Sequence, residues 1–481
     1  MSNLSDLIPA GGGQNNTDFV ADGGITSGKP VILTAAGKAA PIAGVTGSSG
    51  TPVVFESAQS GHISATFDSD SNKVVIAYAD QGSSSYGTAV VGTVSGDAIS
   101  YGTPVVFESA ATGYISATFD SNENKVVIAY RDDGNSDYGT AIVGTVSGTA
   151  ISFGSAAVFE SATSTHISTT FDSNSNKVVI AYKDGGNSDY GTGIVGTVSG
   201  TAISFGTAVV FEAAATQETS CAFDSDANKV VISYQDQGNS SYGTGIVGTV
   251  SGTAISFGTA VVYEASTVDV ATCAFDSDSN KVVIAYNIPS QGTAIVGTVS
   301  GTSISYGAAV AYNSATTSYV AATFDSSLNK VVISYRDEGN SNYGTSIVGT
   351  VSGTAISFGS EVVFEATNVF YVTSTFDSNS NKVVIAYQDA GNSEYGTGIV
   401  TTTGYSNLTA TNLLGIAAGA ISDTATGTIN TWGSRNEVQT SLTIASDYYA
   451  QTDGTITTSD GGQLLGKALS ATQINIKDYT G

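Results

Sequence analysis

The residues best suited to binding chemistry occupy one recurring position of the chain. A segment that begins Phe67-Asp68-Ser69 occurs seven times in closely similar form, and the residue five places before each copy changes from copy to copy. Variation confined to one position of matching units is expected where a scaffold carries recognition. Aromatic, amide and carboxylate groups at a concave mouth suit a carbohydrate ligand, although neutral drift in loops would give the same pattern. The seven residues are His62, Tyr114, His166, Glu218, Val270, Tyr319 and Tyr371.

Charged residues are expected on the same face as these positions. Arg131 and Arg336 each follow a predicted second strand and precede an aspartate, and Lys183 stands at the matching place of another copy. Most of the neighbouring acids are equally explained as solvated groups or as caps of their own turns. The candidate ligand-binding residues are therefore His62, Tyr114, His166, Glu218, Tyr319, Tyr371, Arg131 and Arg336.

Metal binding is not indicated. His62 and His166 are the only two histidines, and neither has a neighbouring ligand at the spacing of a zinc site. Residues 68–72 resemble the start of a calcium loop, but the required glycine and the distant glutamate are missing. An Asx turn accounts for this stretch. We predict neither a metal nor a cofactor.

Catalysis is not indicated either. A sialidase would need several arginines that converge on a carboxylate, whereas this chain has only Arg131, Arg336 and Arg435, and its single tryptophan, Trp432, lies outside the repeats. No nucleophile elbow stands out. Paired carboxylates for glycoside cleavage stay open, so a polysaccharide-degrading enzyme is a third hypothesis. Our prediction is that the protein is not an enzyme.

Short β-strands must position these residues. The copies begin 52, 52, 52, 52, 49 and 52 residues apart, and a period near fifty built from β-type runs is typical of a propeller. Seven copies fall in the usual range for blades around a central channel. In the second copy, strands are predicted at 114–119, 125–130, 140–146 and 150–160. The almost continuous apolar second run indicates burial on both faces.

The two ends of the array indicate how it closes. Pro52 and Pro104 fall in the predicted fourth strand, which should therefore lie at the outer edge. A fourth-strand sequence at 51–57 precedes the first copy, whereas the last copy stops after its third strand. We therefore predict an all-β fold with a seven-bladed propeller over residues 47–404, closed by an N-terminal clasp strand. Such closure leaves no open sheet edge.

Residues 1–46 and 405–481 lie outside the repeat. Strands are predicted there at 29–34, 441–444, 447–451 and 473–476. Because clasp closure brings residues 47 and 404 close together, both flanks are expected to form one small β domain into which the propeller is inserted.

Composition narrows the choice of partners. The chain has 41 acids against 15 bases, a formal net charge of −26, which disfavours nucleic acid and anionic membranes. No run approaches the roughly 18–20 apolar residues that span a bilayer. Cys221 and Cys273 occupy equivalent positions in neighbouring copies and are predicted to be buried thiols, not a disulfide.

The flanking segments carry a resemblance to a known class of proteins. The residues concerned are 2–13 (SNLSDLIPAGGG), 448–454 (YYAQTDG) and 466–472 (GKALSAT). They resemble virion structural proteins of marine tailed phages, of the cyanophage and pelagiphage sort, and the repeats are similar to propeller modules of such proteins. The resemblance implies a place in the virion, with residues 1–46 and 405–481 bound to capsid, collar or tail proteins. It assigns no catalytic residue, and virion fibres in general suggest a homotrimer.

Two function hypotheses follow in addition to the enzyme. The first is a virion fibre, spike or decoration protein whose propeller mediates adhesion, with host-surface glycan as the ligand. The second is a capsid decoration or head-fibre cement protein with an inert propeller. Removal of the repeats would change adsorption to the host under the first hypothesis and leave it unchanged under the second.

Overall fold

The described part of the protein consists of β-strands, short 3-10 turns and connecting loops. The computed structural model describes residues 15–477 apart from residues 35, 43, 46, 404, 407, 409–411, 452–453 and 459–461. Two compact units are present, one of residues 48–403 and one of residues 1–47 with 404–481. No helix among the described residues is long and apolar enough to cross a membrane. The predicted all-β class is confirmed.

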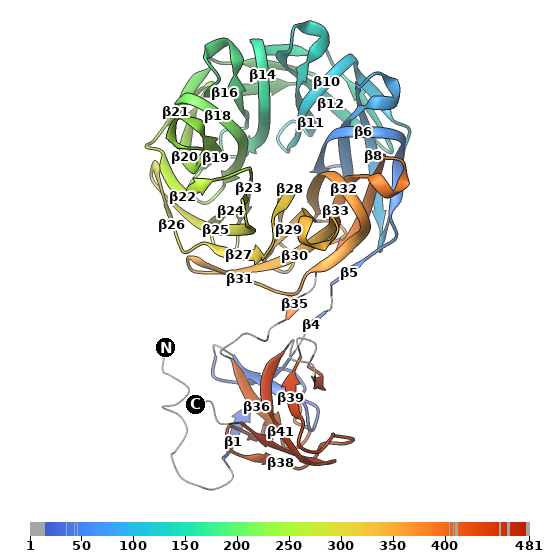
Figure 1. Cartoon of the computed structure of the whole chain (residues 1–481), viewed down its shortest axis with the longest axis vertical. Helices are drawn as coiled ribbons and strands as arrows, with labels where there is room; N and C mark the ends of the chain where they lie inside the picture. The colour runs from blue at the N-terminus through green and yellow to red at the C-terminus, as the bar shows by residue number, and fades with distance from the viewer. Residues whose placement is uncertain are drawn as a thin grey trace. The chain divides into compact units, whose positions relative to one another are not determined.

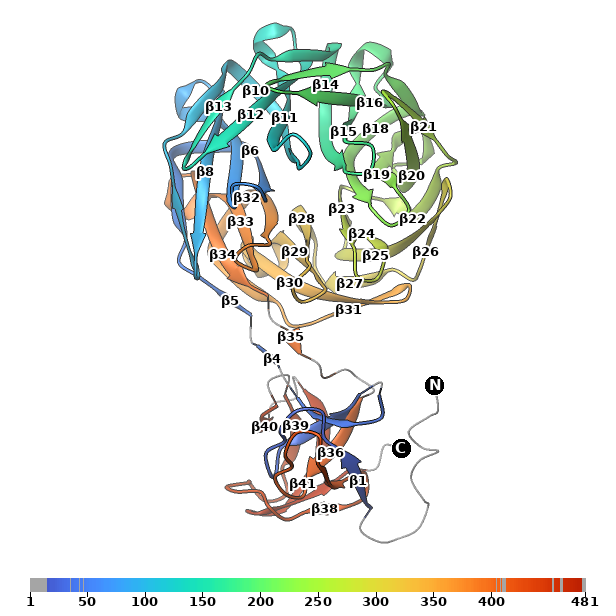
Figure 2. The ribbon, with the colours of Figure 1, turned by 180° about the vertical axis from the view of Figure 1, so that it is seen from behind.

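Within residues 48–403, the repeats surround a common centre (Figures 1 and 2). We number the repeats one to seven by their second strands, which are β7 (Lys73–Asp80), β11 (Lys125–Asp132), β15 (Lys177–Asp184), β19 (Lys229–Asp236), β24 (Lys281–Ile288), β29 (Lys330–Asp337) and β33 (Lys382–Asp389). The third strands are β8 (Tyr86–Ser95), β12 (Tyr138–Ser147), β16 (Tyr190–Ser199), β20 (Tyr242–Ser251), β25 (Gln291–Ser300), β30 (Tyr343–Ser352) and β34 (Tyr395–Thr402). Short outer strands follow as β9 (Ala98–Tyr101), β13 (Ala150–Phe153), β17 (Ala202–Phe205), β21 (Ala254–Phe257), β26 (Ser303–Tyr306) and β31 (Ala355–Phe358).

Long strands connect each repeat to the next. They are β6 (Val53–Asp68), β10 (Val105–Asp120), β14 (Ala157–Asp172), β18 (Val209–Asp224) and β32 (Val362–Asp377). The corresponding strand is in two pieces before repeats five and six, as β22 (Val261–Thr267) with β23 (Val270–Asp276) and β27 (Val310–Asn313) with β28 (Thr317–Asp325). The first half of β14, for example, pairs with β12 of repeat two, and its second half pairs with β15 of repeat three.

This arrangement corrects the strand predicted at 150–160. The strand is interrupted between β13 and β14 because Gly154 approaches the carbonyl oxygen of Thr201, in the hairpin of the next repeat, too closely for a Cβ atom. Pro52 and Pro104 were predicted inside the fourth strand, but they lie just before β6 and β10, outside the strands. Proline has no N–H group for the β-ladder, so it fits the break better than the strand.

The second strands hold the core together. Val126, Val127, Ile128, Ala129 and Tyr130 of β11 are all fully buried, because alternate side chains pack in opposite directions. One set packs in a cluster with β7 of repeat one, and the other set packs in a cluster with β15 of repeat three. Each large apolar side chain buried in this way contributes about 1.5–3 kcal/mol.

The junction between repeats seven and one has the same pairings as the internal junctions. β34 pairs with β5 (Ser48–Ser49) and with the beginning of β6, where Val53 lies opposite Gly398. The hydroxyl group of Thr373 in β32 accepts a hydrogen bond from the backbone N–H of Ala65 in β6 (3.3 Å). Side chains of β7 and β33 share one buried cluster.

The second unit is formed by strands from both flanks. One sheet has the order β1 (Asn16–Val20), β37 (Thr426–Asn430), β36 (Leu413–Ala417), β2 (Pro30–Leu33) and β3 (Ala39–Pro41). The other has the order β38 (Arg435–Asn436), β42 (Gln473–Ile476), β41 (Gln463–Ser470), β39 (Asp447–Ala450) and β40 (Ile456–Thr457). A two-stranded ladder of β4 (Gly44–Val45) and β35 (Tyr405–Ser406) completes the pairings.

The structure of the flanks differs from the sequence prediction in one segment. The strand predicted at 441–444 is wrong, because this segment is a turn in which Ser441 and Ala445 adopt positive φ and the Thr443 N–H donates to the Tyr448 hydroxyl (2.8 Å). Residues 2–13, which carry part of the resemblance to phage proteins, lie outside the described residues.

Candidate functional site

Six repeats hold their predicted binding residue in the left-handed backbone conformation. Each such residue lies at a shift of register between the first and second strands, as between Gly113 and Ser116 of β10. A β-bulge of this kind bends the strand and redirects a side chain. The left-handed conformation costs non-glycine residues roughly 1–2 kcal/mol each, and such residues cluster at functional sites. The φ angles are 49° or 50° at His62, Tyr114, His166, Glu218, Tyr319 and Tyr371.

Neighbouring repeats bring five of these side chains into contact. The ring centroids are 5.4 Å apart for Tyr319–Tyr371, 5.3 Å for Tyr371–His62, 5.4 Å for His62–Tyr114 and 5.2 Å for Tyr114–His166. Interplanar angles between 40° and 57° leave the rings tilted against one another. All five side chains are half-buried, so each leaves part of its surface open. We call these five residues, Tyr319, Tyr371, His62, Tyr114 and His166, the aromatic arc.

The two predicted arginines lie over rings of the arc. The guanidinium carbon of Arg131 is 5.2 Å from the centroid of Tyr114, and that of Arg336 is 5.1 Å from the centroid of Tyr319. Arg336 also lies over Phe370, a ring that packs edge-on against Tyr319. Cations over aromatic faces are attracted to the π-electrons, so the arginines stabilise the positions of these rings.

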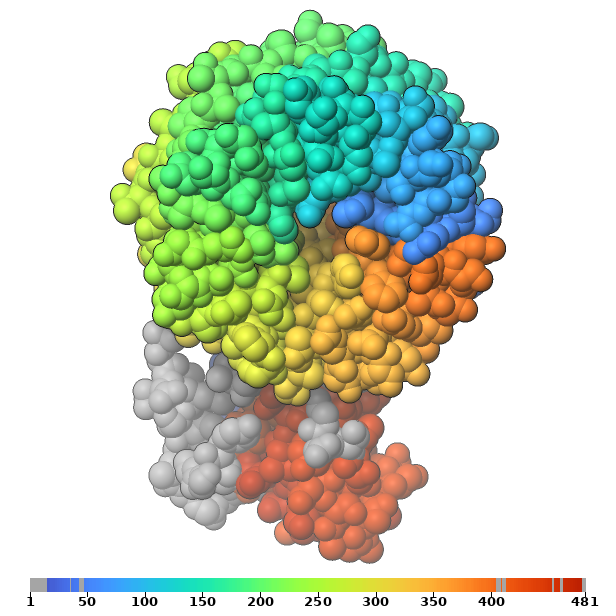
Figure 3. All heavy atoms as spheres, turned by 45° about the horizontal axis from the view of Figure 1, so that its top comes forward, coloured from blue at the N-terminus to red at the C-terminus, as the bar shows by residue number. Residues whose placement is uncertain are grey.

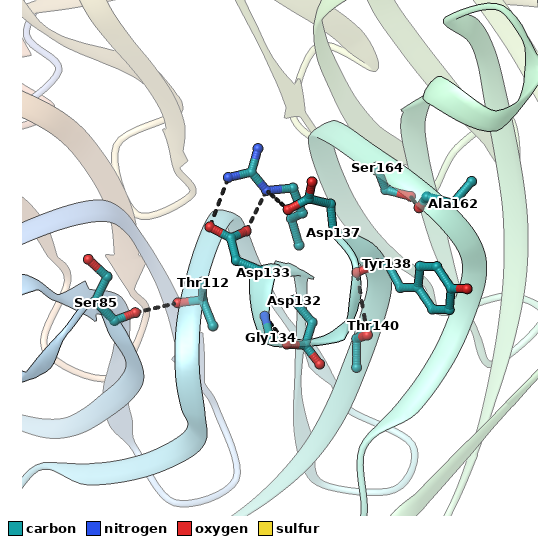
Figure 4. Close-up of polar contacts among 11 residues, drawn as sticks. Ser85, Thr112, Asp132, Asp133, Gly134, Asp137, Tyr138, Thr140, Ala162 and Ser164 are labelled. Atoms are coloured by element: carbon teal, nitrogen blue, oxygen red, sulfur yellow. Dashed lines mark hydrogen bonds and ion pairs between the residues drawn. The ribbon is translucent and has the colours of Figure 1, made fainter.

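Acidic residues bind these arginines from the adjacent loops. The Nε atom of Arg131 lies 2.6 Å from Asp133 and 3.7 Å from Asp137, and Figure 4 shows both carboxylates turned toward one guanidinium group. The Nη2 atom of Arg336 donates to Glu338 (2.9 Å). The sequence prediction did not include these acids as site residues. A signal was present, because an acid stands two residues after each of the two arginines of the repeats.

His166 and Glu218 form the polar end of the arc. The backbone N–H of Glu218 donates to Nδ1 of His166 (3.2 Å), and the Glu218 carboxylate lies 3.7 Å from the same nitrogen. Burial and the nearby Lys183 lower the pKa of His166 to about 4. Burial and the charge of Asp269 raise the pKa of Glu218 to about 7. At neutral pH, His166 is therefore uncharged and accepts through Nδ1, so its remaining proton is on Nε2.

His62 has similar surroundings on the other side of Tyr114. Burial and the charge of Arg131 lower its pKa, and Asp133 opposes this effect. Both histidines of the arc are thus neutral near pH 7.

Repeat five interrupts the pattern. Val270 pairs with Asn287 in a regular register and is absent from the residues with positive φ. The loop after β24 is a tight hairpin in which Ile288 lies opposite Gln291. The other six repeats have a 3-10 turn in this place, namely η2 (Gln81–Ser83), η3 (Asp133–Asn135), η4 (Gly185–Asn187), η5 (Gln237–Asn239), η6 (Glu338–Asn340) and η7 (Ala390–Asn392).

The aspartates that begin the turn between the first and second strands of each repeat accept hydrogen bonds from the backbone. Oδ1 of Asp68 accepts hydrogen bonds from the N–H groups of Asp70 and Ser71, both at 3.0 Å. The same pair of bonds recurs at Asp120 and the later copies, and Asn72 adopts a positive φ of 55°. The Asx turn predicted for this stretch is confirmed.

The surface of this unit is hollowed near its centre on the face seen in Figure 3, where repeats from distant parts of the chain converge.

Comparison with known proteins supports the fold. No protein-family model matches the chain, and no curated protein is significantly similar to it. Among solved structures, the BP39L lectin from Burkholderia pseudomallei is 13% identical with a TM-score of 0.54, and the match covers 73% of this chain and 98% of the lectin. The β-propeller domain of Cps50 (Swd1) from Myceliophteria thermophila is 9% identical with a TM-score of 0.49, covering 73% and 99% of the two chains. The likeness to the lectin concerns the fold alone, and it supports an all-β, propeller-like architecture.

Proposed function

We propose that residues 48–403 form a closed seven-bladed β-propeller. The main support is the junction of repeats seven and one, where β34 pairs with β5 and β6 as β12 pairs with β13 and β14. Nε2 of Gln388 in repeat seven donates to the carbonyl oxygen of Ser60 (2.7 Å), as Gln235 of repeat four donates to Val268 (2.6 Å). A ring closed in this way holds the members of the aromatic arc at fixed separations.

We propose that the aromatic arc binds carbohydrate. The observation that carries this proposal is the row of five tilted, half-exposed rings, each held at a β-bulge with a left-handed backbone. A regular strand contains no such bulge. Aromatic faces pack against the apolar C–H faces of a sugar ring, and a few polar groups such as the imidazole of His166 and the carboxyl of Glu218 fix its orientation. The similar fold of the BP39L lectin agrees with this proposal at the level of fold analogy.

We further propose that the protein is a virion component that displays this propeller for adhesion to host-surface glycan. The support is the resemblance of residues 448–454 and 466–472 to phage virion proteins. The flanking unit would then bind the capsid, collar or tail. Deletion of residues 405–481 should abolish incorporation into particles, whereas deletion of residues 48–403 should reduce adsorption only. Unchanged adsorption after the second deletion would contradict the adhesive role.

A glycan array with the full chain tests the binding proposal directly. The double variant Tyr319→Ala with Tyr371→Ala removes two adjacent rings of the arc, and we expect it to lose at least tenfold in array signal. The control is Tyr449→Ala, a half-buried tyrosine of the flanking unit, which should bind as the parent does. Binding to no glycan, or equal binding by the double variant, would contradict the proposal.

A further inference from the structure

The cations that border the aromatic arc are all engaged by carboxylates. Arg131 is held by Asp133 and Asp137, and the side chain of Arg131 is only 24% exposed. At the matching position of repeat three, Nζ of Lys183 lies 3.3 Å from Asp189. Arg336 is held by Glu338 at 2.9 Å. The matching positions of the other repeats carry uncharged residues, which are Ala79, Gln235, Asn287 and Gln388.

The histidines of the arc add no positive charge. Nδ1 of His166 accepts the backbone N–H of Glu218, a contact that exists only while this nitrogen is unprotonated. His62 lies between the rings of Tyr371 and Tyr114, with centroid separations of 5.3 and 5.4 Å, and its burial there together with the charge of Arg131 lowers its pKa. The arc therefore presents uncharged rings, and each of its nearest cations, Arg131, Lys183 and Arg336, is paired with a carboxylate.

We infer that the arc selects uncharged sugars and rejects sugars that carry a carboxylate, sulfate or phosphate; this inference rests on the proposed carbohydrate-binding function. An anionic group placed on the arc would lose hydration without gaining a free cationic partner, which is unfavourable. The paired acids and the net charge of −26 would repel it further. A neutral pyranose loses little, because its C–H face packs against the rings and its hydroxyl groups stay hydrated at the open side.

The ion pair at Arg131 gives this inference a specific test. Asp133→Asn with Asp137→Asn would free the guanidinium group beside Tyr114 without removing a ring of the arc. A freed arginine is a strong donor to carboxylates. The matched control is Asp70→Asn with Asp226→Asn, which changes the net charge equally at two exposed residues of the turns between β6 and β7 and between β18 and β19.

The experiment uses the full chain on a panel that pairs neutral oligosaccharides with anionic counterparts, such as N-acetyllactosamine with 3′-sialyl-N-acetyllactosamine and cellobiose with cellobiouronic acid. We expect each bound neutral member to exceed its anionic counterpart at least tenfold. The Asp133→Asn with Asp137→Asn variant should narrow this ratio to about threefold or less, while the control keeps it. Melting curves of both variants confirm that they are folded.

The outcomes separate the inference from the function on which it rests. Binding to no panel member by any of the proteins overturns the carbohydrate-binding proposal, and the inference with it. Binding of the anionic members as strongly as the neutral ones overturns the inference alone. An equal change of the ratio in the control variant would also overturn it, because the effect would then come from net charge rather than from Arg131.

Discussion

Tyr101 of repeat one places its hydroxyl group so close to Gly398 of repeat seven that no Cβ atom would fit between them. The same relationship joins Tyr306 of repeat five to Gly245 of repeat four. The contact between the first and last repeats is therefore built like a contact between repeats that are consecutive in the sequence.

This contact predicts a destabilised variant and its rescue. Gly398→Ala should lower the free energy of unfolding by about 1–3 kcal/mol, because the added methyl group overpacks the site. Adding Tyr101→Phe to Gly398→Ala should restore most of the lost stability. The double variant would place an alanine against a phenylalanine, as Ala141 and Phe205 do at the equivalent positions of one core cluster. Denaturant unfolding of the two single variants and the double variant measures the effect. If Gly398→Ala were neutral, or if Tyr101→Phe gave no rescue, the two repeats would not be in contact in solution.

The left-handed bulges predict an unusual preference for glycine over alanine. Tyr114→Gly should be more stable than Tyr114→Ala by about 1 kcal/mol, because only glycine adopts a φ of 50° without strain. The control is Val270, whose backbone is a regular strand. There, alanine should be the more stable replacement by about 0.5–1 kcal/mol. Alanine being better at both positions would show that Tyr114 is not in a bulge.

Glu218 predicts a pH-dependent stability. The pKa of the Glu218 carboxyl is raised to about 7 in the folded protein, so folding favours the protonated carboxyl. The resulting contribution to stability is complete below the pKa that Glu218 has in the unfolded chain, and it is lost as the pH rises through 7. Glu218→Gln avoids this loss and should gain on the order of 2 kcal/mol relative to the parent between pH 4.5 and pH 8. His166 is present in both proteins, so its own titration largely cancels. Chemical denaturation at several pH values tests this, and a difference that is constant with pH would contradict it.

A serine hydrogen bond between the first strands of neighbouring repeats predicts opposite effects on stability for substitutions in two repeats. The Ser116 hydroxyl accepts the backbone N–H of Thr169 in the next repeat (3.0 Å). Ser116→Ala should therefore cost about 1 kcal/mol. In repeat six the matching residue is already alanine, Ala321, and Ala321→Ser should stabilise by a similar or smaller amount. Thermal unfolding compares the two, and a destabilising Ala321→Ser would contradict the pattern.

Much of the architecture could be predicted because the sequence contains nearly identical copies at a regular spacing. The apolar run Val126–Tyr130 indicates burial on both faces, and the structure confirms it. The bounds of the long strands such as β14 could not be predicted, since the break before β14 depends on the contact of Gly154 with the next repeat. Short-range patterns do not contain such tertiary contacts.

The candidate site was predicted in part. The repeat period predicted equivalent positions for five residues, and the structure brings their rings together. They are His62, Tyr114, His166, Tyr319 and Tyr371. The bulge that presents them has no recognised sequence signal, because non-glycine residues occupy its left-handed position. The role of the acids beside Arg131 and Arg336 depends on side-chain geometry, which composition alone does not determine.

A structure of the full chain with a bound neutral oligosaccharide from the array is the most direct test of the central claim. We predict that one sugar ring packs on the aromatic arc, within contact distance of Tyr371, His62 and Tyr114. A sugar bound elsewhere on the protein, with the arc empty, would contradict the assignment of the arc as the binding site.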